Sequence, residues 1–286
     1  MELDGRVAVV TGGTRGVGAG IAGAFARAGA TVVACARRPP EVPLPGVEFI
    51  GLDVRDAAAV GEFFATVASR YGRLDTLVNN AGGTPHRLLR EAGPERHARV
   101  IELNLVAPLT ASLAARPHLD ASRGSIVMIG SVSGTRPSPG SAAYGAAKAG
   151  LESLARSMAV EWAPRVRVNT LVLGMVRTEL SALHYGDQAG IGAVGRTVPL
   201  GRLAEPSDAG DAAVFLASPR AAYISGASLL VHGGGERPAF LDASRADLPG
   251  GPADLPGGSA EEPGGPVDLP GGSAEEEARR RRRDGA

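Results

Sequence analysis

The chain has 286 residues, of which 44% are hydrophobic, and its 30 basic residues balance its 30 acidic ones. This length is that of one large domain or two small ones, and the balanced charge excludes a globally basic surface, so we expect no nucleic-acid partner. The five histidines lack zinc-binding spacing and there is a single cysteine, so we expect no metal site and no intramolecular disulfide. The lone thiol, the absence of a basic leader and the absence of an apolar run of about 20 residues predict a cytoplasmic protein without a membrane span.

Short apolar runs alternate with helix-forming stretches along the first 235 residues. The runs predict strands at 7–11, 31–36, 47–54, 74–80, 124–131, 166–174 and 227–234. The stretches between them predict helices at 17–28, 56–71, 94–115, 142–162 and 206–217. Continuous apolar strands separated by helices indicate a parallel sheet that is covered on both faces. The predicted fold class is therefore α/β, a doubly wound Rossmann fold in a single domain.

The end of the chain differs in composition from the rest. The decapeptide ADLPGGSAEE at 253–262 recurs with one change at 267–276, and arginines fill 279–283. Because Pro-, Gly- and acid-rich sequence buries too little apolar surface to offset the entropy of ordering, we predict a folded domain over 1–241 and a disordered tail over 242–286. A solenoid of repeats is the alternative, but no copy carries an apolar face to stack. The arginines are interpreted as a solvated terminus, with an acidic partner as the alternative, and the apolar cluster PAFL that ends at Leu241 is expected to contact a neighbouring subunit.

A glycine-rich turn, TGGTRGVG at 11–18, joins the first predicted strand to the first predicted helix. Its glycines would let the backbone turn tightly and approach a pyrophosphate, and the helix N-terminus offers free N–H groups to the phosphates. The turn therefore predicts a dinucleotide site that includes Gly12, Thr14, Arg15, Gly16, Val17 and Gly18.

The end of the second predicted strand bears on which dinucleotide is bound. NAD sites usually carry an acid there, but this strand ends in Ala36 and is followed by Arg37 and Arg38. A 2′-phosphate favours guanidinium partners, so we predict NADP(H) rather than NAD(H), with Arg15 and Arg37 as contacts. The alternative is that these arginines are solvated loop charges. Asp53, which ends the third predicted strand, is expected to meet the adenine, or else to serve as a strand-end or helix-capping aspartate.

The stretch SAAYGAAKAG at 141–150 places Tyr144 and Lys148 four residues apart, on one face of a predicted helix. A free phenol has a pKa near 10, and a nearby ammonium would lower it toward the range where a general acid/base works best. Small neighbours would let a nicotinamide and a carbonyl substrate approach the phenol. The alternative is a surface tyrosine and lysine on a good helix former. Ser131, which ends the fifth predicted strand, would donate to the substrate oxygen, with Ser133 as a nearby alternative.

These motifs together resemble the short-chain dehydrogenase/reductase family over about residues 5–235. The residues that carry the resemblance are TGGTRGVG, LDV at 52–54, NNAG at 79–82, Asn104, GS at 130–131 and YGAAK at 144–148. The resemblance implies a seven-stranded parallel sheet, a nicotinamide cofactor and a homotetramer or homodimer. The catalytic set that it implies is Asn104, Ser131, Tyr144 and Lys148. Tyr144 and Lys148 would also contact the cofactor, and the further contacts that it implies are Asp53, Val54, Asn80, Ala81, Gly82, Gly174, Val176 and Thr178.

The resemblance also gives individual residues expected roles. Asn104 would hold a water that links Lys148 to solvent, the alternative being an asparagine that packs inside a helix. Asn79 and Asn80 are expected to be structural first. Leu173 stands where the family usually has proline, which leaves the contact of Thr178 with the cofactor carboxamide less constrained.

Residues 179–200 fall where the family has a variable lid over the substrate. Glycines at 186, 190, 192 and 195 predict short, broken helical segments that move on binding. The expected lining, to which the loop 83–87 contributes, consists of Leu180, Leu183, His184, Tyr185 and Ile191. His184 is otherwise a helix-surface residue.

The sequence thus predicts an NADP(H)-dependent oxidoreductase that transfers a hydride between the nicotinamide and a small-molecule carbonyl or secondary alcohol, with Tyr144 as general acid/base. The lid suits an apolar ketone, a steroid or an acyl thioester. The alternatives are a cofactor-binding sensor or scaffold without turnover, and an isomerase or lyase that uses the cofactor transiently.

Overall fold

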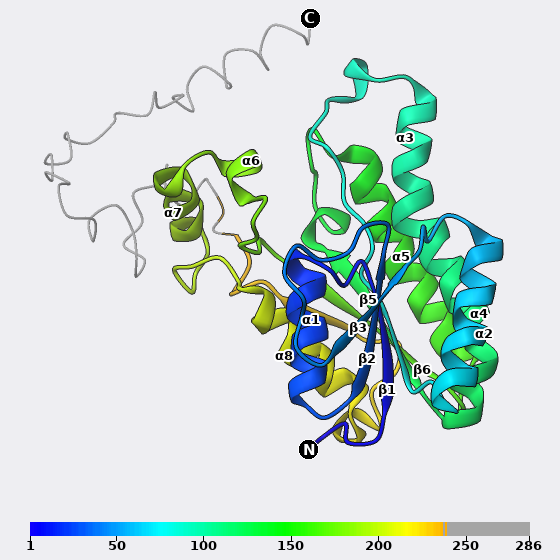
Figure 1. The fold of residues 1–286 in the computed structure, drawn as a ribbon. Coiled ribbons are helices and arrows are strands. Elements are labelled where there is room, and N and C mark those ends of the chain that lie inside the picture. Colours follow the sequence, from blue (N-terminus) through cyan, green and yellow to red (C-terminus); the bar gives the residue numbers. More distant parts are fainter. Residues whose placement is uncertain (237, 239–286) are drawn as a thin grey trace, which may run out of the picture. The chain divides into compact units, whose positions relative to one another are not determined.

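A computed structural model describes residues 1–236 and 238 of the chain, with only the backbone of His184 (Figure 1). The tail expected over 242–286, its boundary after Leu241 and the cluster ending there lie outside the described residues, apart from Pro238. The described chain forms one sheet of seven strands in the order β3-β2-β1-β4-β5-β6-β7, and every neighbouring pair is parallel. The predicted Rossmann architecture is therefore confirmed.

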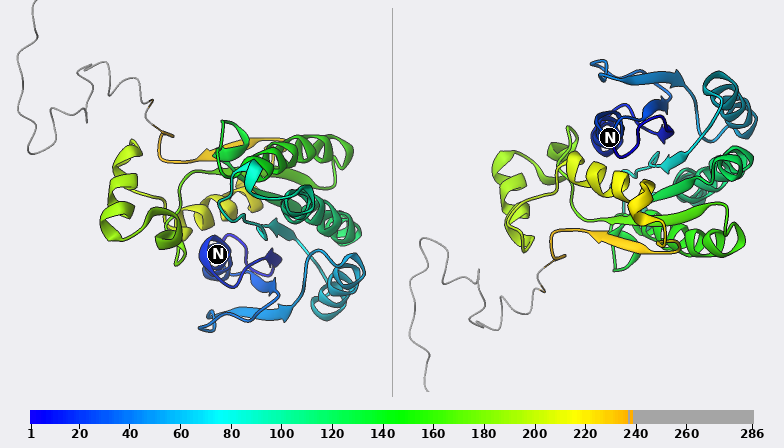
Figure 2. Two further views of the ribbon diagram at one scale, coloured as in Figure 1. Left: turned by 90° about the horizontal axis from the view of Figure 1, so that it is seen from above. Right: turned by 90° about the horizontal axis from the view of Figure 1, so that it is seen from below.

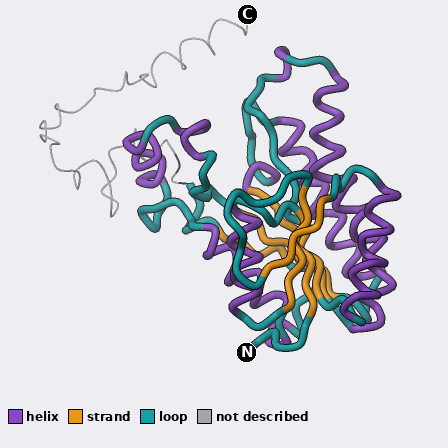
Figure 3. The backbone as a smooth tube through the Cα atoms, viewed as in Figure 1, coloured by secondary structure: helices purple, strands orange, loops and turns teal. Residues whose placement is uncertain are grey.

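The strands form where apolar residues run without interruption. Their bounds are β1 Val7–Thr11, β2 Thr31–Ala36, β3 Val47–Gly51, β4 Thr76–Asn79, β5 Ser125–Ser131, β6 Arg167–Leu173 and β7 Ser228–Val231. All five residues of β1 are buried, because this strand lies between β2 and β4, where Val9 pairs with Val33 and Leu77. The strands run together through the centre of the molecule, with helices on both sides (Figure 3).

Successive side chains of a strand point to opposite faces, so the sheet has two cores. The helices are α1 Gly16–Arg27, α2 Ala57–Tyr71, α3 Pro94–Ile101, α4 Ala107–Ser122, α5 Ala142–Glu161, α6 Ser181–Tyr185, α7 Gln188–Thr197 and α8 Pro206–Ala217. Val9 belongs to a core with α2, α4 and α5, whereas Val10 belongs to a core with α1 and α8. The views from above and below show α6 and α7 (yellow-green) at the opposite end of the domain from α4 and α5 (green) (Figure 2).

Glycines let α1 and α8 touch through their backbones. A Cβ atom added at Gly20 of α1 would overlap Pro206, and one added at Gly210 of α8 would lie 2.8 Å from the Gly20 carbonyl oxygen. This contact leaves no room for a side chain between the helices, so it fixes how α8 sits against the helix that follows the glycine-rich turn.

The helix predicted over 94–115 is different in the structure. It consists of α3, a π-helical turn η2 at Glu102–Val106, and α4, which continues past Pro117 to Ser122. This stretch, Pro94–Ser122, has the length and hydropathy of a membrane span, with 33% of its most apolar window buried. Core helices of proteins that never enter a membrane have the same properties, so this is a weak indication.

The single cysteine offers a test of the core. Cys35 lies on β2 with 0% of its surface exposed, and burial raises the pKa of its thiol to about 12. Because the thiolate is the nucleophile, we expect iodoacetamide to leave the folded protein unmodified at pH 8 and to label it fully in guanidinium chloride, as measured by intact mass. Labelling of the folded protein at the rate of the unfolded chain would contradict this placement.

Candidate active site

The candidate site lies at the carboxyl edge of the sheet, where ligands bind in doubly wound folds. Thr11, Asn79, Ser131 and Leu173 end four neighbouring strands at this edge, and each strand is followed by a loop that carries predicted site residues. The edge lies at the top of the sheet in Figure 1.

The glycine-rich turn has the shape that a pyrophosphate needs. Gly12 and Gly16 have φ of 64° and 51°, values that favour glycine, and a Cβ atom added at Gly18 would overlap the Gly12 carbonyl oxygen. The first hydrogen bond of α1 runs from Ala19 N to Arg15 O at 3.1 Å, so the N–H groups of residues 16–18 precede the helical ladder. These N–H groups are available to an anion, and the cofactor contacts expected of Thr14, Arg15 and Val17 in the same turn stay predictions.

Asn80 and Thr11 hold the loop after β4 against this turn. Asn80 Nδ2 donates to the carbonyl oxygens of Thr11 (2.9 Å) and Gly12 (3.1 Å). Thr11 Oγ1 accepts from the backbone N–H groups of Asn80 and Ala81, at 3.0 Å each. Asn79 instead donates to Ser112 Oγ at 2.9 Å. Both asparagines therefore have the structural role that was expected of them.

Asn104 positions the end of the same loop. It lies in η2 with 0% of its surface exposed. Its Oδ1 accepts from Gly83 N, and its Nδ2 donates to Gly83 O and Val100 O, all at 2.9 Å. A Cβ atom added at Gly82 would lie 2.6 Å from Oδ1, so this loop needs glycine. The amide of Asn104 is thus used within the protein, and its part in a proton relay stays a prediction.

Ser131, Tyr144 and Lys148 come together between the end of β5 and the first turns of α5. Tyr144 is half-buried, and Lys148 is 3% exposed with its Nζ 5.5 Å from the centre of the Tyr144 ring. Lys148 Nζ donates to Ile129 O at 2.7 Å. Ser131 Oγ accepts from Ser133 N at 3.2 Å, so Ser131 helps to shape the turn that carries the alternative serine.

The electrostatics of this pair differ from the expectation. Burial raises the pKa of the Tyr144 phenol, and the hydroxyl of Ser131 opposes this rise by hydrogen bonding. Burial lowers the pKa of Lys148 to about 8. The expected lowering of the Tyr144 pKa by Lys148 is wrong for this arrangement, because burial disfavours the phenolate and the ammonium is bonded to the Ile129 carbonyl.

The small residues around Tyr144 have a packing role that sequence reasoning missed. A Cβ atom added at Gly145 would lie 2.6 Å from the Ser133 carbonyl oxygen, and one at Gly134 would lie 2.8 Å from the backbone nitrogen of Ala149. The turn after Ser131 therefore rests directly on the backbone of α5, which sets the distance between the serine and the phenol.

The end of the site expected to hold the adenine ribose is cationic. Arg15, Arg37 and Arg38 are exposed, and the residues directly after β2 are arginines rather than an acid. Asp53 accepts from Arg55 through both carboxylate oxygens, at 3.0 Å from Nε and 2.6 Å from Nη2, and this pairing lowers the pKa of Asp53 to about 2, with a smaller contribution from Arg37. Asp53 does not cap α2, since that role belongs to Asp56. Arg55, which sequence reasoning did not single out, and Val54 follow Asp53 in the same loop.

The segment after β6 approaches the glycine-rich turn from the other side. A Cβ atom added at Gly16 would lie 3.4 Å from Cγ2 of Thr178. Leu173 pairs with both Ser131 and Val231, so this residue extends the strand where the family usually has proline. Gly174 follows it, and a Cβ atom there would lie 2.7 Å from the His232 side chain.

The two ends of the segment 177–203 are held together by a short backbone bridge between Val176 and Ala204, which we call the neck. Val176 and Ala204 form a parallel bridge, in which Arg177 N donates to Ala204 O at 2.7 Å and Ala204 N donates to Met175 O at 3.0 Å. Within the segment, Gly186 separates α6 from α7, whereas Gly190, Gly192 and Gly195 lie inside α7, so the expected breaks there are wrong.

Two residues of the expected lid lining also differ. Ile191 is buried in a small separate core with Val198 and Leu203, and so is not free to line a substrate site. Leu183, by contrast, is 79% exposed.

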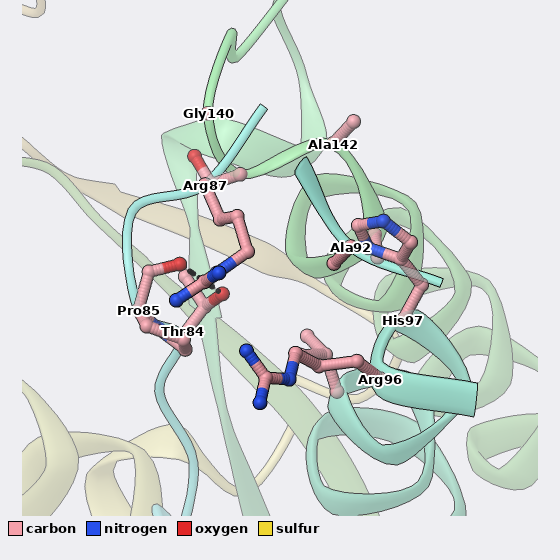
Figure 4. A pocket seen from close by; sticks show the side chains of 11 residues that line it. Thr84, Pro85, Arg87, Ala92, Arg96, His97, Gly140 and Ala142 are labelled. Carbon is pink, nitrogen blue, oxygen red and sulfur yellow. Dashed lines mark hydrogen bonds between the residues drawn. The ribbon is translucent and has the colours of Figure 1, made fainter. Parts of the chain in front are cut away.

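A hollow that is partly open to solvent lies beside the turn that carries Tyr144 (Figure 4). Thr84, Pro85 and Arg87 from the loop expected to contribute line one side, and residues 140–143 line another. Arg96 and His97 of α3 complete it, and sequence reasoning missed both because they lie in a charged stretch without a motif.

Comparisons with known proteins agree with this geometry. A family model described as enoyl-(acyl carrier protein) reductase matches residues 12–236. The chain is 39% identical to L-fucose dehydrogenase of Oryctolagus cuniculus over 81% of its length and 85% of that protein's. It is 37% identical to 3-oxoacyl-[acyl-carrier-protein] reductase of Vibrio harveyi over 82% of its length and 98% of that protein's.

Solved structures show the same likeness. The ligand-free structure of Thermoplasma acidophilum aldohexose dehydrogenase superposes with a TM-score of 0.78 at 29% identity, covering 86% of this chain and 97% of that one. The extent of the matching family model and the identity to both relatives show that the chain belongs to the short-chain dehydrogenase/reductase family of oxidoreductases.

Proposed function

We propose that the protein is an NADP(H)-dependent oxidoreductase that interconverts a carbonyl group and a secondary alcohol on a substrate with an apolar portion. The observation that carries this proposal is the position of Tyr144, Lys148 and Ser131 at the carboxyl edge of the sheet, beside a turn that fits a dinucleotide. A nicotinamide cofactor bound there would supply or accept the hydride. The names of the two relatives support the same reaction class, because one is a reductase and the other a dehydrogenase.

Three side chains have separate roles in the proposed reaction: proton transfer, cofactor binding and stabilisation of the substrate oxygen. Tyr144 gives its phenolic proton to the substrate oxygen during reduction, and its raised pKa keeps that proton in place at neutral pH. Lys148, with a pKa of about 8, is charged at pH 7 and holds the cofactor ribose. Ser131 donates a hydrogen bond to the substrate oxygen as negative charge develops there. Asn104 keeps the Gly82–Gly83 loop in place beside them, and we retain it as the residue that completes the relay.

The remaining cofactor contacts follow from position. Gly12, Thr14, Gly16, Val17 and Gly18 would face the pyrophosphate. Asn80, Ala81, Gly82, Asp53 and Val54 would line the adenosine half, and Gly174, Val176 and Thr178 the nicotinamide half.

The preference for NADP(H) gives the next prediction. Arg37→Asp should shift the ratio of kcat/KM for NADPH over NADH toward NADH, because it replaces a cation near the expected 2′-phosphate with an anion. Arg90→Asp is the matched control, because Arg90 is exposed and lies outside this cationic end of the site. A wild-type enzyme that already has the higher kcat/KM with NADH would contradict the cofactor assignment.

The reaction class is tested by measuring NADPH oxidation at 340 nm across a panel of ketones, oxoacyl thioesters and sugars. Steady consumption that depends on one carbonyl compound supports the proposal. Tight NADPH binding without turnover would instead indicate a cofactor-binding sensor or scaffold, and product without net consumption would indicate an isomerase or lyase.

We also propose that the enzyme is a cytoplasmic homotetramer or homodimer. Leu229 and Leu230 are exposed on the edge strand β7, and Val106 and Leu113 are exposed along η2 and α4, which gives two apolar surfaces for self-association. Light scattering measures the assembly directly.

A further inference from the structure

We infer that the hollow between Arg87 and Arg96 binds an anionic group of the substrate, a carboxylate or a phosphoryl group, and so selects carbonyl compounds that carry one. This inference rests on the proposed function, since it names the substrate class of the same site. Figure 4 shows both guanidinium groups directed into the hollow from opposite sides.

Arg87 is held in place but incompletely paired. Its backbone N–H donates to Gly140 O at 2.7 Å, which anchors the residue across the hollow. Its Nη1 makes one long contact with Glu91 O at 3.4 Å, and its Nε is buried without a hydrogen-bond partner in the described part of the chain. A buried donor without a partner is costly, and an acceptor oxygen in the hollow would satisfy it.

Arg96 has no side-chain partner at all within the described residues. Other arginines there form ion pairs, such as Arg73 with Asp75 and Arg202 with Asp208, but no hydrogen bond or ion pair within residues 1–236 engages the Arg96 guanidinium. None of the residues that line the hollow is acidic. Two guanidinium groups that face one space without a carboxylate between them form a site for an anion, which arginine binds with two parallel hydrogen bonds.

The position of the hollow connects it to the reaction. Ala143, which lines it, directly precedes Tyr144 in the first turn of α5. The two loops on either side are packed together, because a Cβ atom added at Gly140 would overlap the ring of His86. A ligand seated here therefore lies between the loop after β4 and the helix that carries the phenol.

The residues that line the hollow also indicate which chemical group carries the anion. Pro85, Ala92, Val100, Ala142 and Ala143 give the hollow an apolar wall beside the two arginines. The hollow is partly open to solvent, so a carbon chain attached to the anion can extend out of it along this wall. The substrate class is thus an oxo acid or a phosphorylated ketone, with the anion a few carbons from the carbonyl.

The kinetic test compares 5-oxohexanoate with its methyl ester, in which a neutral ester group replaces the distal carboxylate. Arg96→Met should raise KM for the acid about tenfold, the loss of roughly 1.4 kcal/mol of binding, with kcat and the KM for the ester little changed. Arg96→Lys should recover part of the effect, because it restores the charge but not the planar fork. Arg90→Met is the matched control, since Arg90 is exposed nearby and does not line the hollow. Equal changes for acid and ester, or the same change in the control, would overturn the inference.

A second measurement separates failure of the site from failure of the proposed function. Calorimetric titration of 5-oxohexanoate into the protein, without turnover, should give a Kd that Arg96→Met weakens about tenfold. If no ketone is reduced but this binding is seen, the proposed reaction fails and the anion site stands. Absence of binding, or equal Kd values in both proteins, overturns the site. Titration of inorganic phosphate distinguishes a free anion: phosphate should compete with the oxo acid, and binding without competition would overturn the assignment to substrate.

Discussion

Tyr144→Phe should lower kcat for carbonyl reduction by about 10²- to 10⁴-fold and leave the Kd for NADPH within a small factor of the wild-type value. The substitution keeps the ring, its half-buried position and its contact with Lys148, and it removes only the proton that would pass to the substrate oxygen. Steady-state NADPH oxidation measures the loss, and quenching of nucleotide fluorescence measures cofactor binding.

The matched control is Tyr223→Phe, which removes a phenol from a fully exposed side chain outside the proposed catalytic set and the expected lid. If Tyr144→Phe turned over at a rate near that of the wild type, Tyr144 would not be the general acid. If the variant lost cofactor binding to the same degree as activity, the residue would serve the cofactor rather than the proton.

Gly18→Ala should abolish measurable NADPH binding and destabilise the fold by about 1–3 kcal/mol, the usual cost of forcing atoms into a filled space. The new methyl group would overlap the carbonyl oxygen of Gly12 and contact Nδ2 of Asn80, so the glycine-rich turn and the loop after β4 would have to separate. Because the obstructing atom of Gly12 belongs to the backbone, a change of rotamer cannot relieve the clash.

Gly61→Ala is a control of identical chemistry, since Gly61 also lies in a helix and its added methyl group would meet nothing within 4 Å. That change should stabilise the protein by up to about 1 kcal/mol through helix propensity and leave binding unchanged. Thermal unfolding and nucleotide titration of both variants separate local crowding from a general intolerance of alanine. Normal NADPH binding by Gly18→Ala would show that the turn does not hold the cofactor.

Most of the fold could be predicted from local sequence, because buried parallel strands and amphipathic helices carry their own patterns. β1, β2 and α8 have the predicted bounds, and the other strands differ by a few residues at their ends. The π-helical turn at Glu102–Val106 could not be predicted from local sequence. It accompanies a hydrogen bond between Asn104 and Gly83, a partner 21 residues earlier in the chain. The helix predicted to end at residue 115 continues to Ser122, past Pro117, a residue that normally interrupts helical hydrogen bonding.

The candidate site could be predicted where its residues recur at a fixed separation along the chain. It could not be predicted where it depends on contacts between distant segments. Tyr144 and Lys148 share a helix face, and their proximity follows from a separation of four residues. The direction in which the Tyr144 pKa shifts could not be predicted from the sequence. It depends on how deeply the phenol is buried and on the hydrogen bond that the Lys148 ammonium donates to the Ile129 carbonyl oxygen. Arg96 has no motif around it, and only the folding of α3 against the first turn of α5 brings it opposite Arg87.

The neck between Val176 and Ala204 has a consequence for how this protein can diversify. Its hydrogen bonds bring together the two ends of residues 177–203, and Ile191, Val198 and Leu203 give the enclosed segment a small core of its own. The entropy of closing that loop is offset at the neck and depends only weakly on length, at about 0.6 kcal/mol for each doubling. Insertions, deletions or exchanges within residues 182–197 therefore leave the sheet and the proposed catalytic residues almost unaffected, so substrate range can evolve or be engineered in this stretch separately from the stability of the fold.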